Sequence, residues 1–211
     1  MADHTVMAFD YAFKYRTPVM ILADGIIGQM MEKVVLPPYT PRWTEDEIRQ
    51  NTPWATLGKT KDRKPNVINS LRLQASDMEE LNLLLQSRYR EIEEKEVLFE
   101  EFDCEDAEYI IVAFGISARI CQKAVEIARQ KGIKAGMLRP ITLYPFPTEA
   151  LKKYAEKVKG MLSVEMSAGQ MVEDVRLAVN GKVPVEFYGR MGGIVPSPEE
   201  VVTALESKLV K

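Results

Sequence analysis

The second half of the chain alternates between apolar runs and segments with apolar residues at helical spacing. Apolar runs at residues 109–114, 133–138, 161–164 and 183–188 predict four buried strands, because strands covered on both faces form continuous hydrophobic stretches. Helical spacing after each run predicts helices at residues 117–131, 148–158 and 168–179 and from 197 onward. This order predicts an α/β fold, an open parallel sheet with helices on both faces, over residues 107–211.

The first 36 residues predict a smaller, incomplete segment. Helical spacing from Asp3, a suitable N-cap, predicts a helix that stops before Pro18. Residues 18–23 are wholly apolar and predict a strand, followed by a turn at Asp24-Gly25 and a helix over residues 26–34. The strand has no partner within its segment, and unpaired buried backbone groups cost roughly 1 to 3 kcal/mol each. Either it joins the later sheet or its neighbours lie outside this chain.

Residues 37–106 are predicted to form a connector that contains one helix. Five prolines lie among polar residues between positions 37 and 65, and helical spacing from a cap at Ser76 continues to about residue 98. Residues 91–108 carry ten acidic side chains and one basic side chain, Lys95. Two interpretations are open for this acidic stretch: a solvated helix face with its linker, or a docking surface for a basic partner.

Composition excludes several functional classes. The 211 residues include 28 Lys and Arg against 31 Asp and Glu, a net charge of −3 that offers no basic footprint for nucleic acid or an anionic membrane. Two cysteines, Cys104 and Cys121, are too few for a four-cysteine cluster or a disulfide framework. No apolar run reaches the roughly 18 to 20 residues of a membrane span, and the N-terminus lacks a signal-peptide pattern. We therefore expect a cytoplasmic chain without a metal site of its own.

The strand-to-helix turns are where an open parallel sheet binds ligands or partners. Four turns qualify, at residues 24–25, 114–119, 138–145 and 165–170, and the loop at 189–193 lies beyond the last strand. Gly115-Ile116-Ser117 leads into a helix N-terminus whose amides suit an anion, with Arg119 nearby. The alternative is an ordinary tight turn, because the segment matches no phosphate-binding glycine motif.

Few side chains suggest bond-making chemistry. Glu165 ends a strand just before Gly169 and Gln170, and is either a buried acid that orders neighbouring loops or a functional acid. Arg139 suits a salt bridge or an interface. His4 is the only histidine and lies at a predicted helix start, which argues against a histidine-based triad. No catalytic set is complete, and we assign no catalytic residue.

Residues 109–115, residues 132–147 with their Arg-Pro-Ile-Thr-Leu-Tyr-Pro-Phe-Pro run, and residues 164–170 with Glu-Met-Ser-Ala-Gly-Gln carry a specific resemblance. They resemble the transketolase C-terminal-like domain, in the version found in the alpha subunit of 2-oxoacid:ferredoxin oxidoreductases. Residues 8–32 are similar to the end of the same subunit's pyrimidine-binding domain. The resemblance implies three parts: the incomplete end of that domain at 1–36, the connector at 37–106, and the transketolase C-terminal-like domain at 107–211.

The chain departs from this family in two ways. Alpha subunits are considerably longer and begin with a Tyr-Pro-Ile-Thr-Pro segment that shapes the oxoacid site, together with a glutamate that activates the thiamine; neither is present. Position 167 is Ser where related subunits often carry Asn. The resemblance thus implies the C-terminal portion of an alpha subunit, either truncated or from a split subunit.

The resemblance implies part of a thiamine-diphosphate-dependent enzyme that converts a 2-oxoacid to acyl-CoA and reduces ferredoxin, with 2-oxoisovalerate or 2-oxoglutarate favoured over pyruvate. Thiamine diphosphate, magnesium and iron–sulfur clusters would lie in other subunits or domains, and coenzyme A would be the cosubstrate. The expected partners are beta and gamma subunits, with a delta subunit left open, and ferredoxin through the holoenzyme. Neither nucleic acid nor a membrane is expected.

In this interpretation the chain serves assembly and cleft formation and is inactive alone. The residues expected at an interface or lining the cleft are Arg139, Tyr144, Glu165, Gly169, Gln170 and Arg190. One rival is a stand-alone module that holds a phosphorylated ligand at the helix starts near Ser117 and Gly169. Another is a fragment of a transketolase-type thiamine enzyme without iron–sulfur partners.

Overall fold

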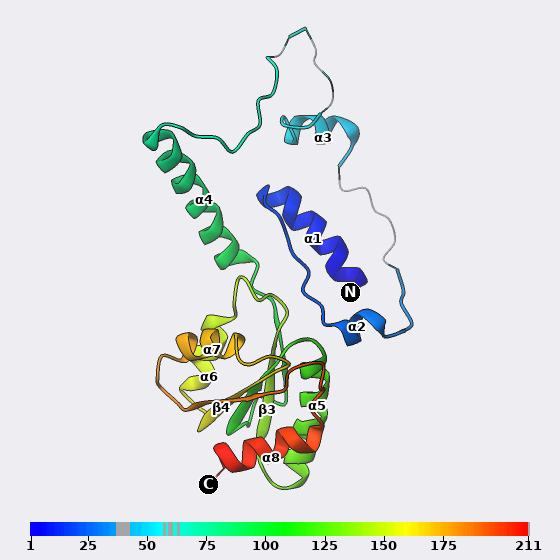
Figure 1. Cartoon of the computed structure of the whole chain (residues 1–211), viewed down its shortest axis with the longest axis vertical. Helices are drawn as coiled ribbons and strands as arrows, with labels where there is room; N and C mark the ends of the chain where they lie inside the picture. The colour runs from blue at the N-terminus through cyan, green and yellow to red at the C-terminus, as the bar shows by residue number, and fades with distance from the viewer. Residues whose placement is uncertain (37–42, 57, 59–60, 63, 211) are drawn as a thin grey trace. The chain divides into compact units, whose positions relative to one another are not determined.

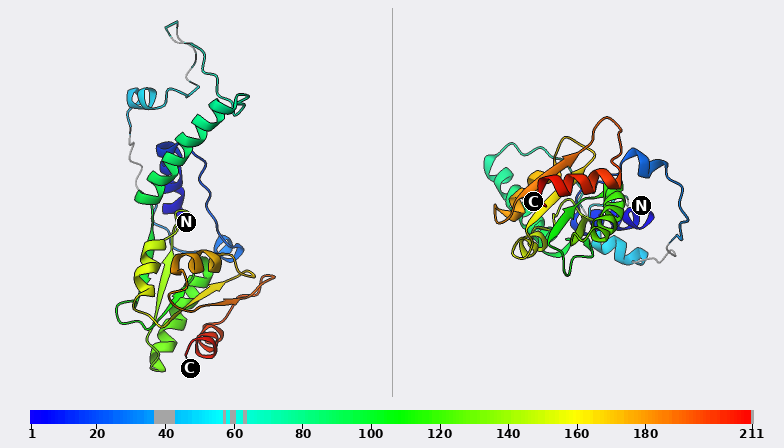
Figure 2. Two further views of the ribbon diagram at one scale, coloured as in Figure 1. Left: turned by 90° about the vertical axis from the view of Figure 1, so that its left-hand side faces the viewer. Right: turned by 90° about the horizontal axis from the view of Figure 1, so that it is seen from below.

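A computed structural model describes residues 1–36, 43–56, 58, 61–62 and 64–210. The chain divides into two compact units, one made of residues 1–21 and 32–88 and the other of residues 22–31 and 89–211. The division falls within one long helix, between Arg88 and Tyr89. Figures 1 and 2 show the elements of each unit.

The larger unit is built on a five-stranded sheet. Its strands are β1 (Phe99–Phe102), β2 (Tyr109–Val112), β3 (Ala135–Pro140), β4 (Gly160–Glu165) and β5 (Val185–Gly189). Their order across the sheet is β1-β3-β2-β4-β5, and the four strands β2 to β5 run parallel. Every residue of β2 and of β4 is buried, as predicted for both, although β4 also contains the polar residues Ser163 and Glu165.

Helices cover both faces of this sheet, as predicted (Figure 1). They are α5 (Gly115–Gln130), α6 (Thr148–Ala155), α7 (Met171–Val179) and α8 (Pro198–Lys208). Side chains of α5 and α8 pack on one face around Ile111 and Leu162. Those of α6 and α7 pack on the other face around Ile110 and Met161. The open α/β fold with two helical layers is therefore confirmed.

The edge strand β1 is a correction to the wholly parallel sheet predicted above. It pairs antiparallel with β3 and lies inside the acidic stretch expected to be helix and linker. Its side chains are mostly exposed, so its sequence lacks the apolar run that marks the other strands. Glu100 of β1 binds Arg139 of β3, with Oε2 and Nη1 2.6 Å apart. Strand pairing thus overrides the weak local signal of this segment.

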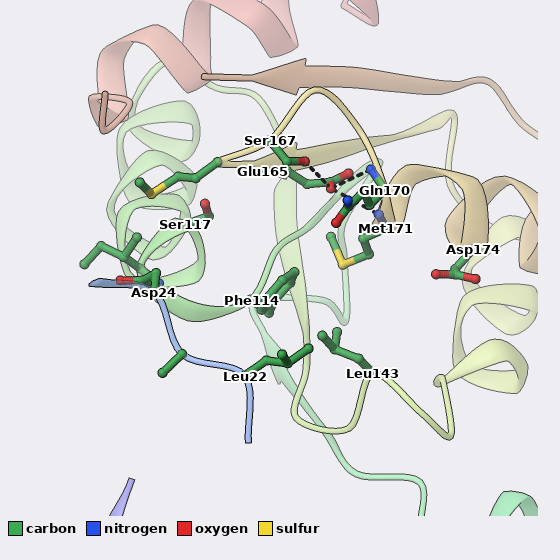
Figure 3. A pocket seen from close by; sticks show the side chains of 13 residues that line it. Leu22, Asp24, Phe114, Ser117, Leu143, Glu165, Ser167, Gln170, Met171 and Asp174 are labelled. Atoms are coloured by element: carbon green, nitrogen blue, oxygen red, sulfur yellow. Dashed lines mark hydrogen bonds between the residues drawn. The ribbon is translucent and has the colours of Figure 1, made fainter. Parts of the chain in front are cut away.

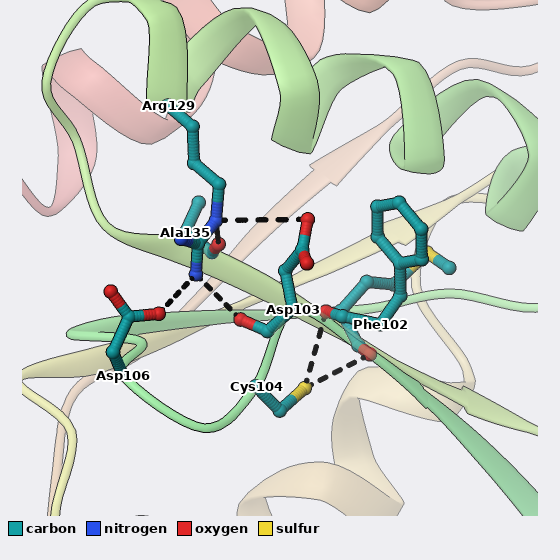
Figure 4. Close-up of polar contacts among 7 residues, drawn as sticks. Phe102, Asp103, Cys104, Asp106, Arg129 and Ala135 are labelled. Carbon is teal, nitrogen blue, oxygen red and sulfur yellow. Dashed lines mark hydrogen bonds and ion pairs between the residues drawn. The ribbon is translucent and has the colours of Figure 1, made fainter.

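Arg129, at the end of α5, ties that helix to the loop between β1 and β2 (Figure 4). Its guanidinium donates to the main-chain oxygens of Ala135, at 2.7 Å, and Asp103, at 2.6 Å. It also binds the Asp106 carboxylate at 2.7 Å and lowers the pKa of that acid. A second pair joins Lys159 to Glu108, and its hydrogen bond lowers the pKa of that acid as well. Several acids of the stretch therefore neutralise bases of the same unit, which supports the interpretation as a solvated face.

The larger unit also contains α2 (Gly25–Gln29), a single short helix where residues 26–34 were predicted. The proline stop expected for that helix lies at residues 37–38, outside the described residues.

The smaller unit contains α1 (Ala2–Tyr15), α3 (Glu45–Asn51) and the first two thirds of α4 (Ala75–Lys95). Helix α3 was missed in the predicted connector, although Thr44 and Glu47 form a capping box at its start. The Arg16 guanidinium lies 4.4 Å from the centre of the Trp54 ring, which packs this connector against the end of α1. Asp3, predicted as a cap, lies inside α1, and Met1 occupies the N-cap position.

Residues 18–23 form no strand, which corrects the prediction made for them. They are extended, and Met20 and Leu22 are 79% and 61% exposed. A strand needs a neighbour to bond with, and none of the five strands of the sheet pairs with this segment. No helix of the described part is long and apolar enough to cross a membrane.

Candidate functional site

A cavity of about 440 Å³ lies at the carboxyl edge of the sheet, within the larger unit (Figure 3). All four strand-to-helix turns singled out in the sequence contribute to its wall. The chain runs from β2 to β3 on one side and then returns to β4 on the other side of β2. Open α/β sheets bind their ligands at such a switch in strand order. The lining residues are Leu22, Ala23, Asp24, Phe114, Ile116, Ser117, Leu143, Glu165, Met166, Ser167, Gln170, Met171 and Asp174.

Glu165 is the most heavily bonded side chain of this wall. It is 4% exposed at the end of β4, and its carboxylate accepts five hydrogen bonds. Two come from the hydroxyls of Ser163 and Ser167, at 3.1 and 3.0 Å. Three come from the main-chain amides of residues 170, 171 and 172, at 2.9 to 3.1 Å. The carboxylate therefore caps the N-terminus of α7 and holds the β4–α7 turn.

This bonding decides between the two roles left open for Glu165. A carboxylate offers about four lone-pair positions, and five donors already converge on this one. It has no acceptor capacity left for a reacting proton or a ligand. The geometry therefore favours the loop-ordering role over that of a functional acid.

Asp24 caps two helices at once. Its Oδ1 accepts from the amide of Ile27 at 2.8 Å, at the start of α2, and its Oδ2 accepts from the amide of Ile116 at 3.0 Å, at the start of α5. Gly115 makes this approach possible, because a Cβ there would lie 2.9 Å from Oδ2 and its φ is +60°. A residue 92 positions away in sequence is thus fixed to the first turn of α5.

Ser117 differs from its polar neighbours in the wall. It is 3% exposed and lines the cavity, yet no described residue forms a hydrogen bond with its hydroxyl. No buried side-chain polar atom of the described residues lacks a hydrogen-bond partner, so this oxygen is one that solvent in the cavity can reach. The hydroxyl is therefore available to a group that enters the cavity.

The charged residues of the wall all have the same sign. Asp24, Glu165 and Asp174 supply three carboxylates, and none of the described lining residues is Lys, Arg or His. Burial raises the pKa of Asp174, and the negative charges of Glu173 and Glu165 raise it further. Two of the three carboxylates, Asp24 and Glu165, are bonded to helix amides, and the rest of the lining is largely apolar.

The other predicted site residues are not among those that line the cavity. Tyr144 is 59% exposed, packs edge-on against Tyr89 and donates to Glu93 at 3.3 Å. Arg190 binds Glu200 at 2.7 Å, near the start of α8. Gly169 has a φ of +107°, which its turn requires. Arg139 is paired on the edge strand, as described above, and Arg119 is not among the lining residues.

Thus Glu165, Gln170 and Ser117 come together, whereas Arg139, Tyr144 and Arg190 lie apart from the cavity wall. Whether any of them contacts a partner stays a prediction. Asp24 and Asp174 were missed as site residues. Asp24 could have been found as the side chain preceding the glycine of a strand-to-helix turn, whereas Asp174 carries no sequence signal because it lies within a helix.

The described residues do not form a binding site for a diphosphate or a metal. The N-termini of α5 and α7, which would suit phosphate oxygens, carry the carboxylates of Asp24 and Glu165. Within the described part, no three His, Cys, Asp or Glu residues are grouped as a metal site requires. Cys104 and Cys121 are both buried, and burial raises the pKa of each thiol.

The α/β fold of this chain has a counterpart among solved structures. A solved structure titled 2-oxoglutarate:ferredoxin oxidoreductase from Magnetococcus marinus matches 64% of this chain and 24% of its own, with a TM-score of 0.56 and 18% identity. At that identity the match concerns the fold alone.

Sequence comparison gives the family. Residues 107–201 match pyruvate:ferredoxin oxidoreductase core domain II, and residues 1–95 match the thiamine-diphosphate-binding domain of pyruvate flavodoxin/ferredoxin oxidoreductases. The ketoisovalerate oxidoreductase subunit VorB of Methanothermobacter marburgensis is 47% identical over 92% of this chain. The 2-oxoglutarate synthase subunit KorA of Archaeoglobus fulgidus is 31% identical over 97%. The chain belongs to the family of 2-oxoacid:ferredoxin oxidoreductase subunits.

The chain spans about half the length of these relatives, 53% of VorB and 57% of KorA. A more distant relative, the pyruvate synthase subunit PorA of Methanothermobacter thermautotrophicus, is 24% identical over 90% of this chain.

Proposed function

We propose that this chain is part of the alpha subunit of a thiamine-diphosphate-dependent oxidoreductase that converts 2-oxoisovalerate to its acyl-CoA and reduces ferredoxin. The observation that carries the proposal is the identity to VorB over nearly the whole chain. Identity falls from 47% for that ketoisovalerate subunit to 31% for the 2-oxoglutarate subunit and 24% for the pyruvate subunit. 2-Oxoglutarate is therefore the second choice of substrate.

Within this enzyme the chain would serve assembly and the formation of the cofactor cleft. Its most buried acid, Glu165, is fully engaged in ordering a turn. Extended apolar residues such as Met20 and Leu22 are exposed, as they would be on a surface that another part of the enzyme covers. The isolated chain is accordingly proposed to be inactive.

The cofactors and partners belong to the assembled enzyme. Bound there, thiamine diphosphate supplies the carbanion chemistry for loss of CO2, and magnesium, iron–sulfur clusters and coenzyme A complete the reaction. The partners are beta and gamma subunits, with delta left open, and ferredoxin is the electron acceptor. This chain would contribute the carboxyl edge of its sheet. That edge is held in place by Asp24, which caps α2 and α5, and by Glu165, which caps α7.

A stand-alone phosphoryl-binding module is a weaker alternative. Both helix starts that it would use are capped by carboxylates of the chain itself, and the lining of the cavity is negatively charged. A phosphate would enter against that charge. The anion-binding role of Ser117 and Arg119 therefore stays a prediction with no support from the cavity.

The proposal is tested by reconstitution. The chain is coexpressed with the remaining subunits encoded beside it, and coenzyme-A-dependent reduction of ferredoxin is measured with three 2-oxoacids at equal concentration. We expect the largest kcat/KM with 2-oxoisovalerate, a smaller value with 2-oxoglutarate and the smallest with pyruvate, and no turnover by the chain alone. A preference for pyruvate, or saturable turnover by the isolated chain, would contradict the proposal.

A further inference from the structure

The turn between α7 and β5 contains Asn180-Gly181, the one place in the sequence where a glycine follows an asparagine. In such a pair the main-chain nitrogen of the glycine can attack the Cγ atom of the asparagine side chain, because glycine has no Cβ to obstruct the approach. The attack forms a cyclic succinimide and releases ammonia, and water then opens the ring. The product is either aspartate or isoaspartate, in which the main chain continues through the side-chain carboxyl carbon.

Asn180 is placed where its side chain is free to react. It is exposed and caps the C-terminus of α7 in the left-handed region, with φ 49° and ψ 43°. Its side chain forms no hydrogen bond with any residue that the structure describes. L-residues adopt this backbone conformation rarely, although asparagine tolerates it better than most. Neither the side chain nor the intrinsic backbone preference therefore holds Asn180 in its present conformation.

Gly181 leaves the attacking nitrogen accessible. No described residue accepts a hydrogen bond from its main-chain amide, and a Cβ built on it would meet no atom within 4 Å. The nitrogen reaches Cγ by rotation about ψ of Asn180. This rotation is opposed by a 3.2 Å hydrogen bond from the Lys182 amide to the Val179 oxygen, and by the exposed ion pair of Lys182 with Glu156. Exposed contacts of this kind restrain a turn only weakly.

The other four asparagines lack this combination, because each is followed by a residue with a side chain. Three of them also have bonded side chains. Asn66 and Asn82 donate to main-chain oxygens at 2.7 and 2.8 Å. Asn69 accepts from the Leu71 amide at 3.0 Å.

Asp24-Gly25 provides a contrast within the same chain, because an aspartate before a glycine can form the same succinimide. Both oxygens of Asp24 are bonded, Oδ1 to the Ile27 amide at 2.8 Å and Oδ2 to the Ile116 amide at 3.0 Å. The carboxylate is fixed by two helix starts, so it reacts only when both caps open. The fold thus protects one of the two pairs and leaves the other free.

We propose that Asn180 is a site of spontaneous modification, which deamidates in the folded chain and thereby loosens the turn between α7 and β5. A bond forms from the Gly181 nitrogen to Cγ of Asn180 and the Cγ–Nδ2 bond breaks, while the Gly181 amide proton leaves with the ammonia. Water then adds to either carbonyl of the ring, and nothing is oxidised or reduced. The new carboxylate lies at the C-terminus of α7, where the helix dipole disfavours negative charge. Isoaspartate also lengthens the main chain and disrupts the left-handed cap.

The experiment keeps the full chain at pH 8 and physiological temperature beside two synthetic peptides with the sequences of residues 178–183 and 22–27. Conversion at each asparagine and at Asp24 is followed by peptide mapping with mass spectrometry, and isoaspartate is labelled with isoaspartyl methyltransferase. We expect Asn180 in the folded chain to convert within tenfold of the rate in its peptide. We expect Asp24 to react more than tenfold more slowly than in its peptide.

Three results would overturn the proposal. The first is conversion of Asn180 more than tenfold slower than in its peptide, which would show that the turn restrains it. The second is conversion no faster than that of Asn82. The third is reaction of Asp24 as fast as in its own peptide, since the modification would then report an open chain rather than this turn.

Two variants test the site and its consequence. Asn180→Gly removes the reacting amide and suits the left-handed cap, so the variant should fold normally and take up no methyl label at this position. Asn180→Asp supplies the ordinary product, and exchange of the Lys182 amide should accelerate at least threefold while β4 stays unchanged. Asn82→Asp, the same change on the exposed face of α4, is the matched control and should leave Lys182 unaffected. Equal labelling of Asn180→Gly, or unchanged Lys182 exchange in Asn180→Asp, would contradict the proposal.

Discussion

Two carboxylates, Asp24 and Glu165, organise the carboxyl edge of this protein. Each satisfies main-chain amides that a helix leaves unpaired in its first turn, and each does so from outside the helix it caps. The role of Glu165 as a loop-ordering acid was one of the two sequence interpretations. Asp24 was identified as a turn residue, but its bond to Ile116 could not be foreseen, because the two are separated by 92 positions in the sequence.

Replacing Glu165 is expected to be costly for folding. Glu165→Gln places an amide NH2 where amide and hydroxyl donors converge, so at least one buried donor loses its acceptor. We expect the free energy of unfolding to fall by about 3 kcal/mol in urea titrations. Glu173→Gln, which removes an exposed carboxylate from the same helix, should change it by less than about 0.5 kcal/mol. A loss below about 1 kcal/mol for Glu165→Gln would show that the cap does not hold the turn.

Replacing Asp24 is expected to act locally. Asp24→Ala removes the acceptors of the Ile27 and Ile116 amides, and loss of an N-cap costs about 1 kcal/mol for each helix start. Hydrogen exchange of these two amides should therefore accelerate at least fivefold, while exchange in β2 and β4 stays unchanged. Asp24→Asn keeps one acceptor oxygen, so the exchange rates of these amides should lie between those of the wild type and Asp24→Ala. If the Ile116 amide exchanges equally fast in wild type and Asp24→Ala, the bond between the turn and α5 is absent in solution.

At the scale of elements, the parallel part of the fold follows from the sequence with little ambiguity. The run that forms β2 is apolar throughout and that of β4 is interrupted by Ser163 and ends at Glu165, yet both strands are buried on both faces, and no other element type fits runs so short between turn signals. The ends of the strands were predicted less accurately. Strand β3 begins at Ala135 and continues through Pro140, whereas residues 133–138 were predicted. Pro140 is tolerated there because it lies at the end of the strand.

The elements that the sequence analysis missed lack an apolar run. Strand β1 is acidic and exposed and is held in place by pairing with β3, a long-range contact that local patterning does not encode. Residues 18–23 are the opposite case, a strand that was predicted but does not form. Their run is apolar, but no strand in the described part pairs with it. Apolar sequence thus shows that a segment is built to be buried, but it does not show against what.

Arg129 is expected to fix the end of α5 to the β1–β2 loop. Arg129→Lys keeps the charge but removes the planar guanidinium, whose Nε and Nη2 together bond to Ala135, Asp103 and Asp106. We expect a loss of about 1 to 2 kcal/mol in the free energy of unfolding, measured with urea. Lys123→Gln, which breaks an exposed pair on the same helix, should cost less than about 0.5 kcal/mol. Equal losses in the two variants would contradict a special role for the Arg129 contacts.

At the scale of the whole molecule, the two cysteines are built into the core. Burial raises the pKa of both thiols, so they stay protonated and inaccessible at neutral pH. A thiol whose pKa is raised in the folded state stabilises the fold fully only at pH values below the thiol pKa of the unfolded chain, which is about 8.5. This contribution is lost as the pH rises through and beyond that value. Ellman's reagent at pH 8 should therefore detect no thiol in the native chain and two in 6 M guanidinium. Rapid reaction of either native thiol would contradict the burial described here.

The whole chain is proposed to be a piece of a larger enzyme rather than a self-sufficient binding module. Its larger unit has a complete two-faced core, whereas apolar residues along 19–36 are exposed. The apolar run at residues 18–23 has no partner strand in its own segment, so the sequence already left open that its neighbours lie outside this chain. The sequence does not show which part of the enzyme covers the run.

The most direct test of this account is hydrogen exchange of the chain with and without its coexpressed partner subunits. We predict that residues 19–36 and the turns at 114–117 and 165–171 gain protection of at least tenfold in the complex, while β2 and β4 are already protected in the free chain. Complex formation that leaves residues 19–36 and both turns exchanging as in the free chain would contradict the account.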